Sequence, residues 1–444
     1  MRGKMNKLTL AVVIVAVVIV VAGITAGFVL TKKTPTKTSI VFSGWVSSGA
    51  EYTFDQKMVS TFNSQHSNIS VVFEPITSNY YASLSTKFST NTAPSVFYME
   101  NNVLPAYAKA GYLLNLTPVL SANTSYDLQG FVPNIVNTFH YKGGLYAAPK
   151  DWNPLFIYYN KAIFNQEHVP YPSNLTAWNW TTMVSTLTAL KKNISSLPGG
   201  GSGYYPMVIG PQFARILAFM HQAGGQWINQ AGTGASSKSA GLLSAINFWY
   251  GLYAKGLAGL NSNLSAGWNG GDFATGKVGM VMSGGWTVPV ATGNGSFFKS
   301  NPQDLGYYHT PSGVQNGTMM FSVGLAVNSH LTGTKKWAAE QFVEYFTGPA
   351  GEQQWVSLGL ALPSRTAILQ SSTYAAEQPI LAYAGSTEFP YAYGWNYNTT
   401  NFSAAESGAH TIIVSLFAGK LNPTQAYQQI LAETNSSLAG SSSL

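Results

Sequence analysis

An alternation of predicted strands and helices near the start of the chain constrains the fold more than any other feature. The run SIVFSGW, residues 39–45, has the pattern of a buried strand, and Phe54, Met58 and Phe62 follow at the spacing of an amphipathic helix. A second strand is predicted over NISVVFEPI, a second helix over YYASLSTKFST and a third strand over PSVFYME. This order predicts an α/β fold built on a doubly wound, parallel sheet.

Polar and aromatic residues stand where these predicted strands end. Trp45 and Glu51 follow the first strand, and Glu100, Asn101 and Asn102 close the third. Ligands bind beyond the carboxyl ends of the strands in open α/β sheets. We therefore expect these five residues to contact a ligand, with the acids and amides bonding to its polar groups. Two alternatives stay open: a core position for Trp45, and a helix start at Ala50 for Glu51.

Composition narrows the function classes. The chain has 444 residues, of which 45% are hydrophobic and only 9% charged, so two or three domains with sizeable cores are expected. The formal charge is +7, but the basic residues form no stripe, and we expect no nucleic-acid partner. Cysteine is absent, which excludes disulfides, thiol nucleophiles and a lipid-modified cysteine. No metal or cofactor motif is found, and none is expected.

An apolar N-terminal run predicts attachment to a membrane. Residues Leu8–Leu30 carry no charge and are long enough to cross the hydrocarbon core as a helix. Arg2, Lys4 and Lys7 precede the run, which places the N-terminus in the cytoplasm and the rest of the chain outside. The competing interpretation is a cleaved signal peptide. We expect residues 1–38 to form a cytoplasmic stub, an anchor (8–30) and a short tether, with the body on the extracellular side of the cell membrane.

The stretch DFATGKVGMVMSGGW, residues 272–286, ends in an unusual way. Gly284 and Gly285 directly precede Trp286, so the largest side chain follows the two residues that cover least. These residues alone leave two interpretations open: a core tryptophan at the end of a strand, or an aromatic platform that faces a cleft.

Four stretches, in consistent order, resemble the extracellular sugar-binding proteins of ABC importers, the group that includes maltose-binding protein. They are APSVFYMENNVLPAYAKAGYLLNLTP, YAAPKDWNPLFIYYNKAIF, DFATGKVGMVMSGGW, and AAEQFVEYFTGPAGEQQW with GLALPSR shortly after it. Each motif is weak by itself, but the four together span much of residues 39–435. Gly279 stands where the family commonly has alanine, and the lipid-attachment cysteine is missing.

The resemblance implies a two-lobe, periplasmic-binding-protein-like fold whose lobes are joined by a hinge and hold a sugar between them. Lobe 1 would comprise residues 39–150 plus 311–347, and lobe 2 residues 151–310 plus 348–444. The implied function is binding of a sugar or oligosaccharide and its delivery to the permease subunits of an ABC transporter. We expect a monomer.

The resemblance also implies which residues contact the sugar. Trp286 matches the family's stacking tryptophan, and Trp395 falls where the family has another stacking ring. Asp151, at the expected hinge, would accept a hydroxyl bond, with Trp152 and Asn153 as close alternatives. Trp268 is a further candidate in a glycine-rich loop. Arg365 is expected to hold carbonyls or an ion pair within the fold.

Two other function classes stay open. A membrane-anchored glycoside hydrolase needs two carboxylates across one bond, and Glu100 with Asp151 is the pair we nominate. A passive glycosylated surface protein would account for the anchor and for the many Asn-x-Ser/Thr sequons, but not for the ordered motifs. No nucleophile elbow, phosphate loop or His-Glu-x-x-His motif occurs, so we expect a binding protein and no enzyme.

Overall fold

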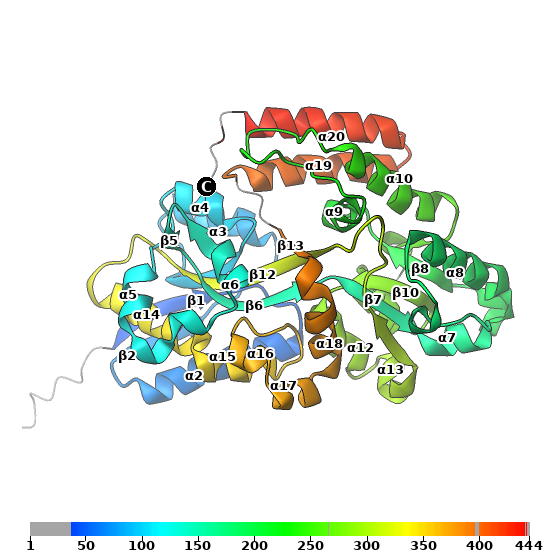
Figure 1. The fold of residues 1–444 in the computed structure, drawn as a ribbon. Coiled ribbons are helices and arrows are strands. Elements are labelled where there is room, and N and C mark those ends of the chain that lie inside the picture. Colours follow the sequence, from blue (N-terminus) through cyan, green and yellow to red (C-terminus); the bar gives the residue numbers. More distant parts are fainter. Residues whose placement is uncertain (1–36, 265, 396–398, 440, 442–444) are drawn as a thin grey trace, which may run out of the picture.

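The computed structural model describes residues 37–264, 266–395, 399–439 and 441, and shows two lobes side by side (Figure 1). The predicted membrane anchor, Leu8–Leu30, lies outside the described residues, as does most of the tether. Within the described part of the chain, no helix is both long and apolar enough to cross a membrane.

The first lobe is built on a mixed sheet with the strand order β13-β12-β3-β1-β2, in which β6 also pairs with β12. Its strands are β1 (Thr38–Ser43), β2 (Ile69–Phe73), β3 (Val96–Glu100), β6 (Ala148–Pro154), β12 (Thr318–Val327) and β13 (Ala392–Gly394). β1 runs parallel to β2 and β3, as the sequence predicts. β12 is antiparallel to both β3 and β6, which makes the sheet mixed and not purely parallel.

The first helix shows how local sequence builds this lobe. In α2 (Gly49–Gln65) the Ser48 hydroxyl accepts a hydrogen bond from the Glu51 N–H at 3.2 Å, which caps the helix. The predicted stripe of Phe54, Met58 and Phe62 is buried against the sheet. The sequence therefore fixes both where this helix starts and which face it buries.

Other helices cover the same sheet. They are α3 (Tyr80–Ser89), α4 (Leu104–Lys109), α5 (Thr117–Ala122), α6 (Pro133–Val136), α14 (Gly333–Thr347), α15 (Pro349–Val356), α16 (Thr366–Leu369), α17 (Ser372–Glu377) and α18 (Pro379–Glu388). A small hairpin, β4 (His140–Tyr141) and β5 (Gly144–Leu145), lies beside them. The predicted stop and restart at Gly348-Pro349 is confirmed, because α14 ends at Thr347 and α15 begins at Pro349.

The second lobe has a five-stranded sheet with the order β11-β7-β10-β8-β9. Its strands are β7 (Phe156–Asn160), β8 (Tyr205–Ile209), β9 (Gly259–Leu260), β10 (Val278–Ser283) and β11 (Leu305–Tyr308). Its helices are α7 (Lys161–Gln166), α8 (Trp180–Asn193), α9 (Phe213–Gln222), α10 (Ala240–Ala254), α11 (Asn269–Ala274), α12 (Val288–Thr292), α13 (Phe297–Ser300), α19 (Phe402–Phe417) and α20 (Pro423–Leu438). α20 is tied to this lobe by the Trp227 Nε1, which donates to the Thr434 Oγ1 at 2.7 Å.

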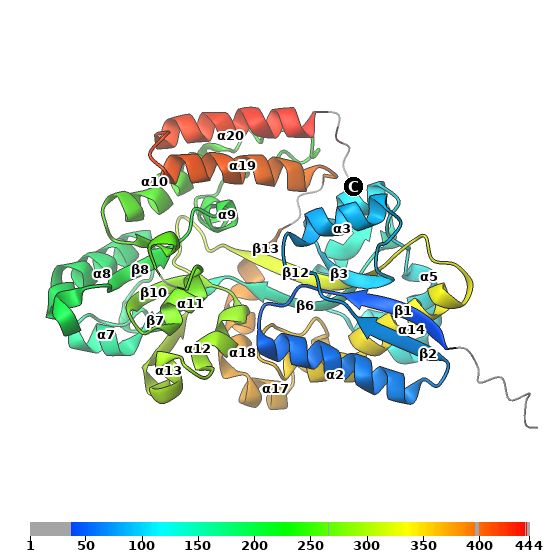
Figure 2. The same cartoon turned by 180° about the vertical axis from the view of Figure 1, so that it is seen from behind.

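The chain passes between the two sheets at several points. β6 ends at Pro154 and β7 begins at Phe156, so a single residue, Leu155, separates a strand of one sheet from a strand of the other. A second passage joins β11 to β12. Figure 2 shows β6 and β12 running through the middle of the molecule between the lobes. Strands shared in this way let the lobes move relative to each other about few residues.

Helix α15 packs with the first lobe. The Trp355 ring lies 5.3 Å from the Phe54 ring and 6.5 Å from the Tyr98 ring, both measured between centroids. The sequence-based boundaries place residues 348–444 with the second lobe, and these contacts place α15 with the first. The sequence of α15 contains one aromatic residue, Trp355, and does not show which lobe that ring would meet.

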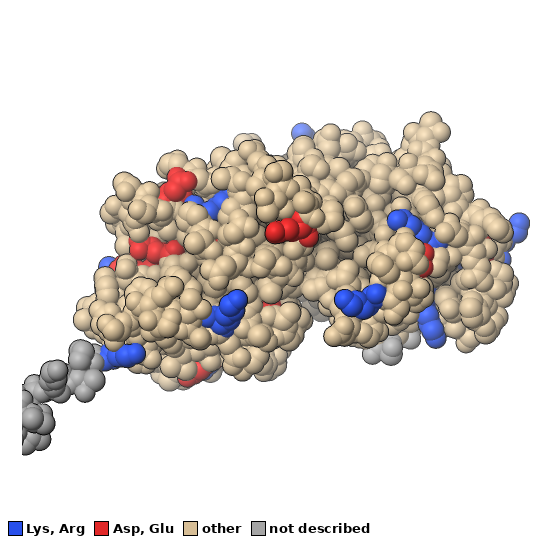
Figure 3. Space-filling view, turned by 90° about the horizontal axis from the view of Figure 1, so that it is seen from below, with Lys and Arg blue, Asp and Glu red and all other residues tan. Residues whose placement is uncertain are grey.

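Charged side chains are scattered over the surface. Figure 3 shows one face on which a few basic and acidic side chains, some of them next to each other, are scattered among many uncharged residues. This agrees with the charged fraction of 9% and with the absence of a basic stripe in the sequence.

Candidate functional site

A cavity of about 320 Å³ lies between the lobes, and we call it the cleft. Both lobes line it. Its lining residues are Trp45, Ser47, Glu51, Glu100, Lys150, Asp151, Asn153, Arg215, Trp286, Phe321, Val323, Trp355, Leu360, Ala361 and Trp395. Seven of the residues predicted from the sequence are among them: Trp45, Glu51, Glu100, Asp151, Asn153, Trp286 and Trp395.

Strand β12 forms the floor of the cleft. Its residues Phe321 and Val323 line the cavity, and they share one face because side chains alternate along a strand. Val323 pairs with Glu100 of β3 on one side and with Asp151 of β6 on the other. The two acids therefore flank the floor with their Cα atoms about 9.5 Å apart, which is two strand spacings.

A β-bulge brings one more charge to this floor. Asp151 pairs with Val323 and Pro149 pairs with Gly324, so Lys150 is the extra residue of β6. A bulge re-aims side chains, and here Lys150 and Asp151 both line the cleft although they are neighbours in sequence. The Lys150 Nζ lies 2.7 Å from the Asp151 Oδ2 and 3.3 Å from the centroid of the Trp355 ring. Lys150 is thus held by a carboxylate and by an aromatic face.

Further acids stand behind this ion pair. The Tyr98 hydroxyl donates to the Asp55 Oδ1 at 2.9 Å, and the Lys150 Nζ lies 4.4 Å from the centroid of the Tyr98 ring. Burial raises the pKa of Asp55 to about 8, and the charge of Lys150 opposes that shift. Glu51 accepts a hydrogen bond from the Ser47 N–H at 2.7 Å. Each charged or acidic group on this side of the cleft therefore has a partner within the first lobe.

Glu100 closes β3 beside this group. Its N–H donates to the Tyr81 hydroxyl at 2.8 Å. Burial raises the pKa of Glu100 to about 7; a hydrogen bond with Tyr81 opposes the shift, and the nearby Asp151 adds to it. Near neutral pH this side chain is able both to donate and to accept a hydrogen bond.

Aromatic rings dominate the side of the cleft that faces the second lobe. The Phe321 ring contacts two indoles: its centroid lies 4.7 Å from that of Trp395 and 5.6 Å from that of Trp286, both edge-to-face. Trp395 follows β13, and its N–H donates to the Met320 O at 3.0 Å, which fixes it beside the floor. Trp286 follows β10 in a short turn, Gly285–Thr287. Both indoles are only partly buried.

The two glycines before Trp286 have a specific packing role. A Cβ on Gly284 would lie 2.5 Å from the Trp286 ring, so the indole folds back over its own glycine. A Cβ on Gly285 would lie 2.3 Å from the Asn153 Oδ1, and that oxygen accepts a hydrogen bond from the Gly285 N–H at 3.0 Å. The missing side chain of Gly284 thus leaves room for the indole, and that of Gly285 lets Asn153 of β6 come within hydrogen-bond distance. The remaining surface of the ring faces the cleft.

Arg215, on the first turn of α9, completes this side. Its guanidinium carbon lies 5.8 Å from the Phe321 ring centroid and 6.0 Å from that of Trp286. Its Nε is buried without a hydrogen-bond partner. Burial lowers the pKa of the guanidinium to about 10.

Four predicted residues do not line the cleft. Trp152 is fully buried: it lies between Asp151 and Asn153 in β6, so strand alternation sends its ring to the opposite face of the sheet, where Nε1 donates to the Pro363 O at 2.8 Å. The Asn101 N–H donates to the Ser322 O at 3.1 Å, and the Asn102 O accepts from the Ser403 Oγ at 3.1 Å. These two asparagines hold β12 and α19 in place.

Trp268 is the fourth. It precedes α11, and its indole covers the small residues of that helix, because a Cβ on Gly270 would lie 2.3 Å from the ring. Arg365, by contrast, has the expected structural role: its guanidinium donates to the carbonyl oxygens of Tyr126, Asp127 and Thr347 and pairs with Glu352 at 3.3 Å.

Sequence reasoning missed several lining residues: Ser47, Lys150, Arg215, Phe321, Val323, Trp355, Leu360 and Ala361. Arg215 had a usable signal, because a lone arginine inside the apolar run FARILAFM stands out in a chain with 9% charged residues. Lys150 had no such signal in the sequence, because the bulge that directs its side chain toward the cleft depends on pairing with the distant β12.

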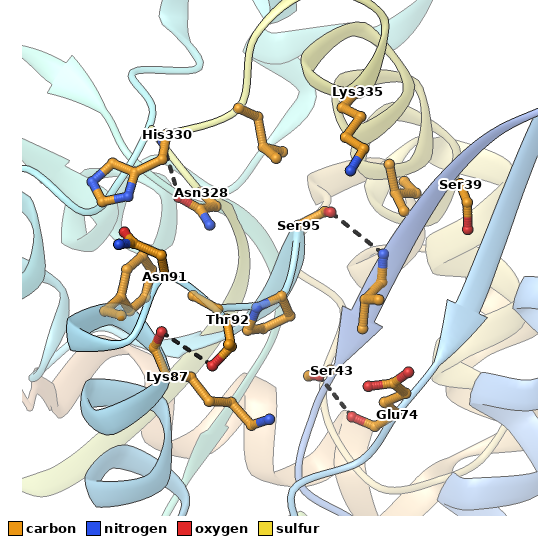
Figure 4. Close-up of a pocket in the computed structure, with 16 residues that line it drawn as sticks. Ser39, Ser43, Glu74, Lys87, Asn91, Thr92, Ser95, Asn328, His330 and Lys335 are labelled. Atoms are coloured by element: carbon orange, nitrogen blue, oxygen red, sulfur yellow. Dashed lines mark hydrogen bonds between the residues drawn. The ribbon is translucent and has the colours of Figure 1, made fainter.

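A second cavity, of about 420 Å³, lies within the first lobe and is shown in Figure 4. It is lined by β1, by the end of α3 and by the residues around His330 and Lys335. All of its lining comes from one lobe, so a ligand there would not bridge the two. Within the described residues, no group of three or more histidines and acids is placed to hold a metal ion.

Comparisons with known proteins agree with this architecture. The family model of the bacterial extracellular solute-binding proteins matches residues 57–382. No curated protein sequence matches the chain at a significant level.

Several solved structures share the fold. An ABC substrate-binding protein from Listeria monocytogenes, Lmo0181, solved in complex with cycloalternan, has a TM-score of 0.79 at 18% identity, covering 90% of this chain and 99% of that one. Maltose-bound MalE3 of T. maritima has a TM-score of 0.77 at 16% identity, with 90% and 99% covered. The sugar-binding protein MalE from Xanthomonas citri has a TM-score of 0.73 at 18% identity, with 90% and 97% covered.

At these identities the solved structures establish the two-lobe α/β fold, while the family model covers most of the chain. The resemblance seen in the sequence motifs is confirmed. The chain belongs to the family of bacterial extracellular solute-binding proteins.

Proposed function

We propose that this protein binds a sugar or oligosaccharide in the cleft and delivers it to the permease subunits of an ABC transporter. One observation carries the proposal: three partly buried indoles, Trp45, Trp286 and Trp395, line the same interlobe cavity as Glu51, Glu100 and Asp151. Aromatic faces pack against the C–H faces of a sugar ring, and carboxylates accept bonds from its hydroxyls. The volume of about 320 Å³ lies in the range of small-ligand sites.

The ligands of the solved relatives support this class. Lmo0181 was solved with cycloalternan and MalE3 with maltose. Both are oligosaccharides, and both proteins have the fold of this chain. A passive surface protein would have no use for a cleft whose rings and acids converge from two lobes.

The lobes should close around the ligand. A sugar that touches β6 and Trp286 together stabilises the closed form through contacts that exist only there. We propose that the lobes move about Leu155 and the segment between β11 and β12, close to the predicted divisions at residues 150/151 and 310/311. The whole of β6, β13 and helices α15 to α18 then move with lobe 1, because they belong to its sheet or pack on it.

We also propose that Leu8–Leu30 anchors the protein in the cell membrane, with the body outside and monomeric. The length of the run and its basic N-terminal flank support this. Fractionating cells and sequencing the mature N-terminus tests the anchor. A soluble product that starts near Ala26 would replace the anchor with a cleaved signal peptide.

The binding proposal is tested with a sugar panel. The full-length chain is mixed with neutral and acidic mono- and oligosaccharides, and its melting temperature is recorded for each. A ligand at 100 times its Kd adds about 2.7 kcal/mol to the free energy of unfolding, which a thermal shift detects easily. If no sugar raises the melting temperature, the proposal fails.

The glycoside hydrolase alternative retains one supporting observation, since Glu100 and Asp151 both face the cleft. Against it, Asp151 is bound to Lys150 at 2.7 Å, which holds its charge in the fold. Hours of incubation with the oligosaccharide that stabilises the protein should leave it intact. Shorter products that disappear in Glu100→Gln would move the protein to the hydrolases.

A further inference from the structure

The second-lobe side of the cleft contains a cation, Arg215, that has no anionic partner among the described residues. The chain has three arginines, of which Arg2 lies outside the described residues and Arg215 and Arg365 lie within them. All 16 acidic side chains are also in the described part, and none of them forms an ion pair with Arg215. The Nε of Arg215 is buried and has no hydrogen-bond partner.

Two other cations of the described part each have an anionic partner in the fold. Arg365 pairs with Glu352 at 3.3 Å and donates to three carbonyl oxygens. Lys150 pairs with Asp151 at 2.7 Å. Both keep their charge inside the protein because the fold supplies an anion. Arg215 reaches a partly buried, cleft-lining position with its Nε buried and only rings beside it.

Partial burial of a guanidinium without an anion is costly, because protein atoms replace part of the water that solvated the charge. The lowered pKa of Arg215, about 10, reflects that cost. A carboxylate placed in the cleft would offset it, since the guanidinium presents parallel N–H donors that match two carboxylate oxygens. Hydroxyls of a neutral sugar accept the same hydrogen bonds but leave the charge uncompensated.

The opposite side of the cleft limits how much negative charge a ligand brings. Glu51, Glu100 and Asp151 line it, and only Asp151 has a cation paired with it. A carboxylate carries one negative charge and a phosphate monoester nearly two at neutral pH. Lys150 compensates Asp151, and burial raises the pKa of Glu100 to about 7, so the repulsion comes from Glu51 and from Glu100 when it is ionised. It favours the singly charged group and sets an orientation: the carboxylate toward Arg215 and the hydroxyls toward the acids.

We infer that the cleft selects an acidic saccharide, one whose sugar carries a carboxylate that pairs with Arg215. This rests on the proposed function and specifies its ligand class. The ring centroids of Trp286 and Phe321 lie 6.0 Å and 5.8 Å from the guanidinium carbon, and these rings stack against the sugar that bears the carboxylate.

Matched pairs of probes test the inference. The full-length chain is titrated calorimetrically with digalacturonic acid against galactobiose, with cellobiouronic acid against cellobiose, and with glucose 1-phosphate. We expect at least one uronate to bind about 10- to 100-fold more tightly than its neutral match, which is the affinity that one charge-assisted hydrogen-bonded pair contributes.

Binding of neutral sugars with no preference for a uronate would overturn the inference and leave the proposed function standing. If neither class binds, the proposed function itself fails. Tighter binding of glucose 1-phosphate would overturn the carboxylate assignment.

Variants locate the effect. Arg215→Gln keeps a hydrogen-bond donor and removes the charge, and should abolish the preference for the uronate while changing neutral-sugar affinity less than about fivefold. Arg215→Lys should retain part of the preference. The control is Lys299→Gln, which removes one exposed charge from the same lobe and should leave the preference intact. An equal loss for both sugars in Arg215→Gln would make Arg215 a hydroxyl ligand and overturn the inference. If Arg215→Gln does not fold, the wild-type preference alone decides.

Discussion

The two sides of the cleft satisfy their charges in opposite ways. On the first-lobe side, Lys150 is held by Asp151 and by the Trp355 ring, and Asp55 accepts from Tyr98 behind them. On the second-lobe side, Arg215 stands among Trp286 and Phe321 with no carboxylate. The charges of the first side belong to the fold, and the groups of the second are available to a ligand. Breaking the Lys150–Asp151 pair should therefore act mainly on stability, and substituting Trp286 or Arg215 should act mainly on affinity.

The largest expected effect is the response of the first side to pH. Burial raises the pKa of Asp55 from 3.8 to about 8 and that of Glu100 from 4.5 to about 7. Between about pH 4 and these values the folded chain keeps protons that the unfolded chain releases. The free energy of unfolding is therefore highest in mild acid and falls as pH rises through the window, by up to about 1.4 kcal/mol per pH unit for each carboxyl.

Denaturant unfolding from pH 4 to 9 measures this fall. Asp55→Asn, which still accepts from Tyr98, should flatten the curve, while the exposed Glu377→Gln should not. An Asp55→Asn curve that falls as steeply as that of the wild type would contradict the assignment of Asp55 as protonated in the fold.

The second effect comes from breaking the ion pair on the first side. Lys150→Met leaves Asp151 buried without its cation and should lower the free energy of unfolding by about 3–5 kcal/mol. The double variant Lys150→Met/Asp151→Asn should recover a large part of the loss, because no charge is then left unpaired. Urea unfolding of the three proteins forms the test, and equal stability of the single variant and wild type would remove the contrast between the two sides.

The third effect belongs to the second side. Trp286→Ala removes a ring that faces the cleft and should cost about 2–3 kcal/mol of sugar binding, or roughly 30- to 150-fold in Kd. Because the indole is only partly buried, the melting temperature without ligand should change little. Calorimetry and thermal melting are measured on the same preparation. A variant that melts much earlier but binds normally would make Trp286 a core residue.

The smallest effect is expected at Trp268, which the sequence placed at the ligand and the structure places over Gly270. Trp268→Ala should change the Kd for sugar by less than about twofold, the range of substitutions that touch neither core nor ligand. A loss comparable to that of Trp286→Ala would return this residue to the cleft.

Features set by local sequence were predictable, and features set by distant pairing were not. The alternation of strands and helices over residues 38–100, the helix break at Gly348 and the position of Trp286 after a strand all follow from nearby residues. The faces of Asp151, Trp152 and Asn153 depend on their register with β12, so the sequence could nominate all three but could not separate them. The bulge at Lys150 has the same origin.

The floor strand β12 also has a consequence for the kinetics of binding. It is hydrogen-bonded to β3 and β6 on its two edges, so Phe321 and Val323 stay in place when the lobes open. An arriving ligand meets this fixed floor first and is enclosed only when Trp286 and Arg215 approach. The floor then governs the association rate constant, and the side that carries Trp286 and Arg215 governs the dissociation rate constant. Relatives that share the floor but differ at the positions of Trp286 and Arg215 would bind their ligands at similar rates and release them at different rates.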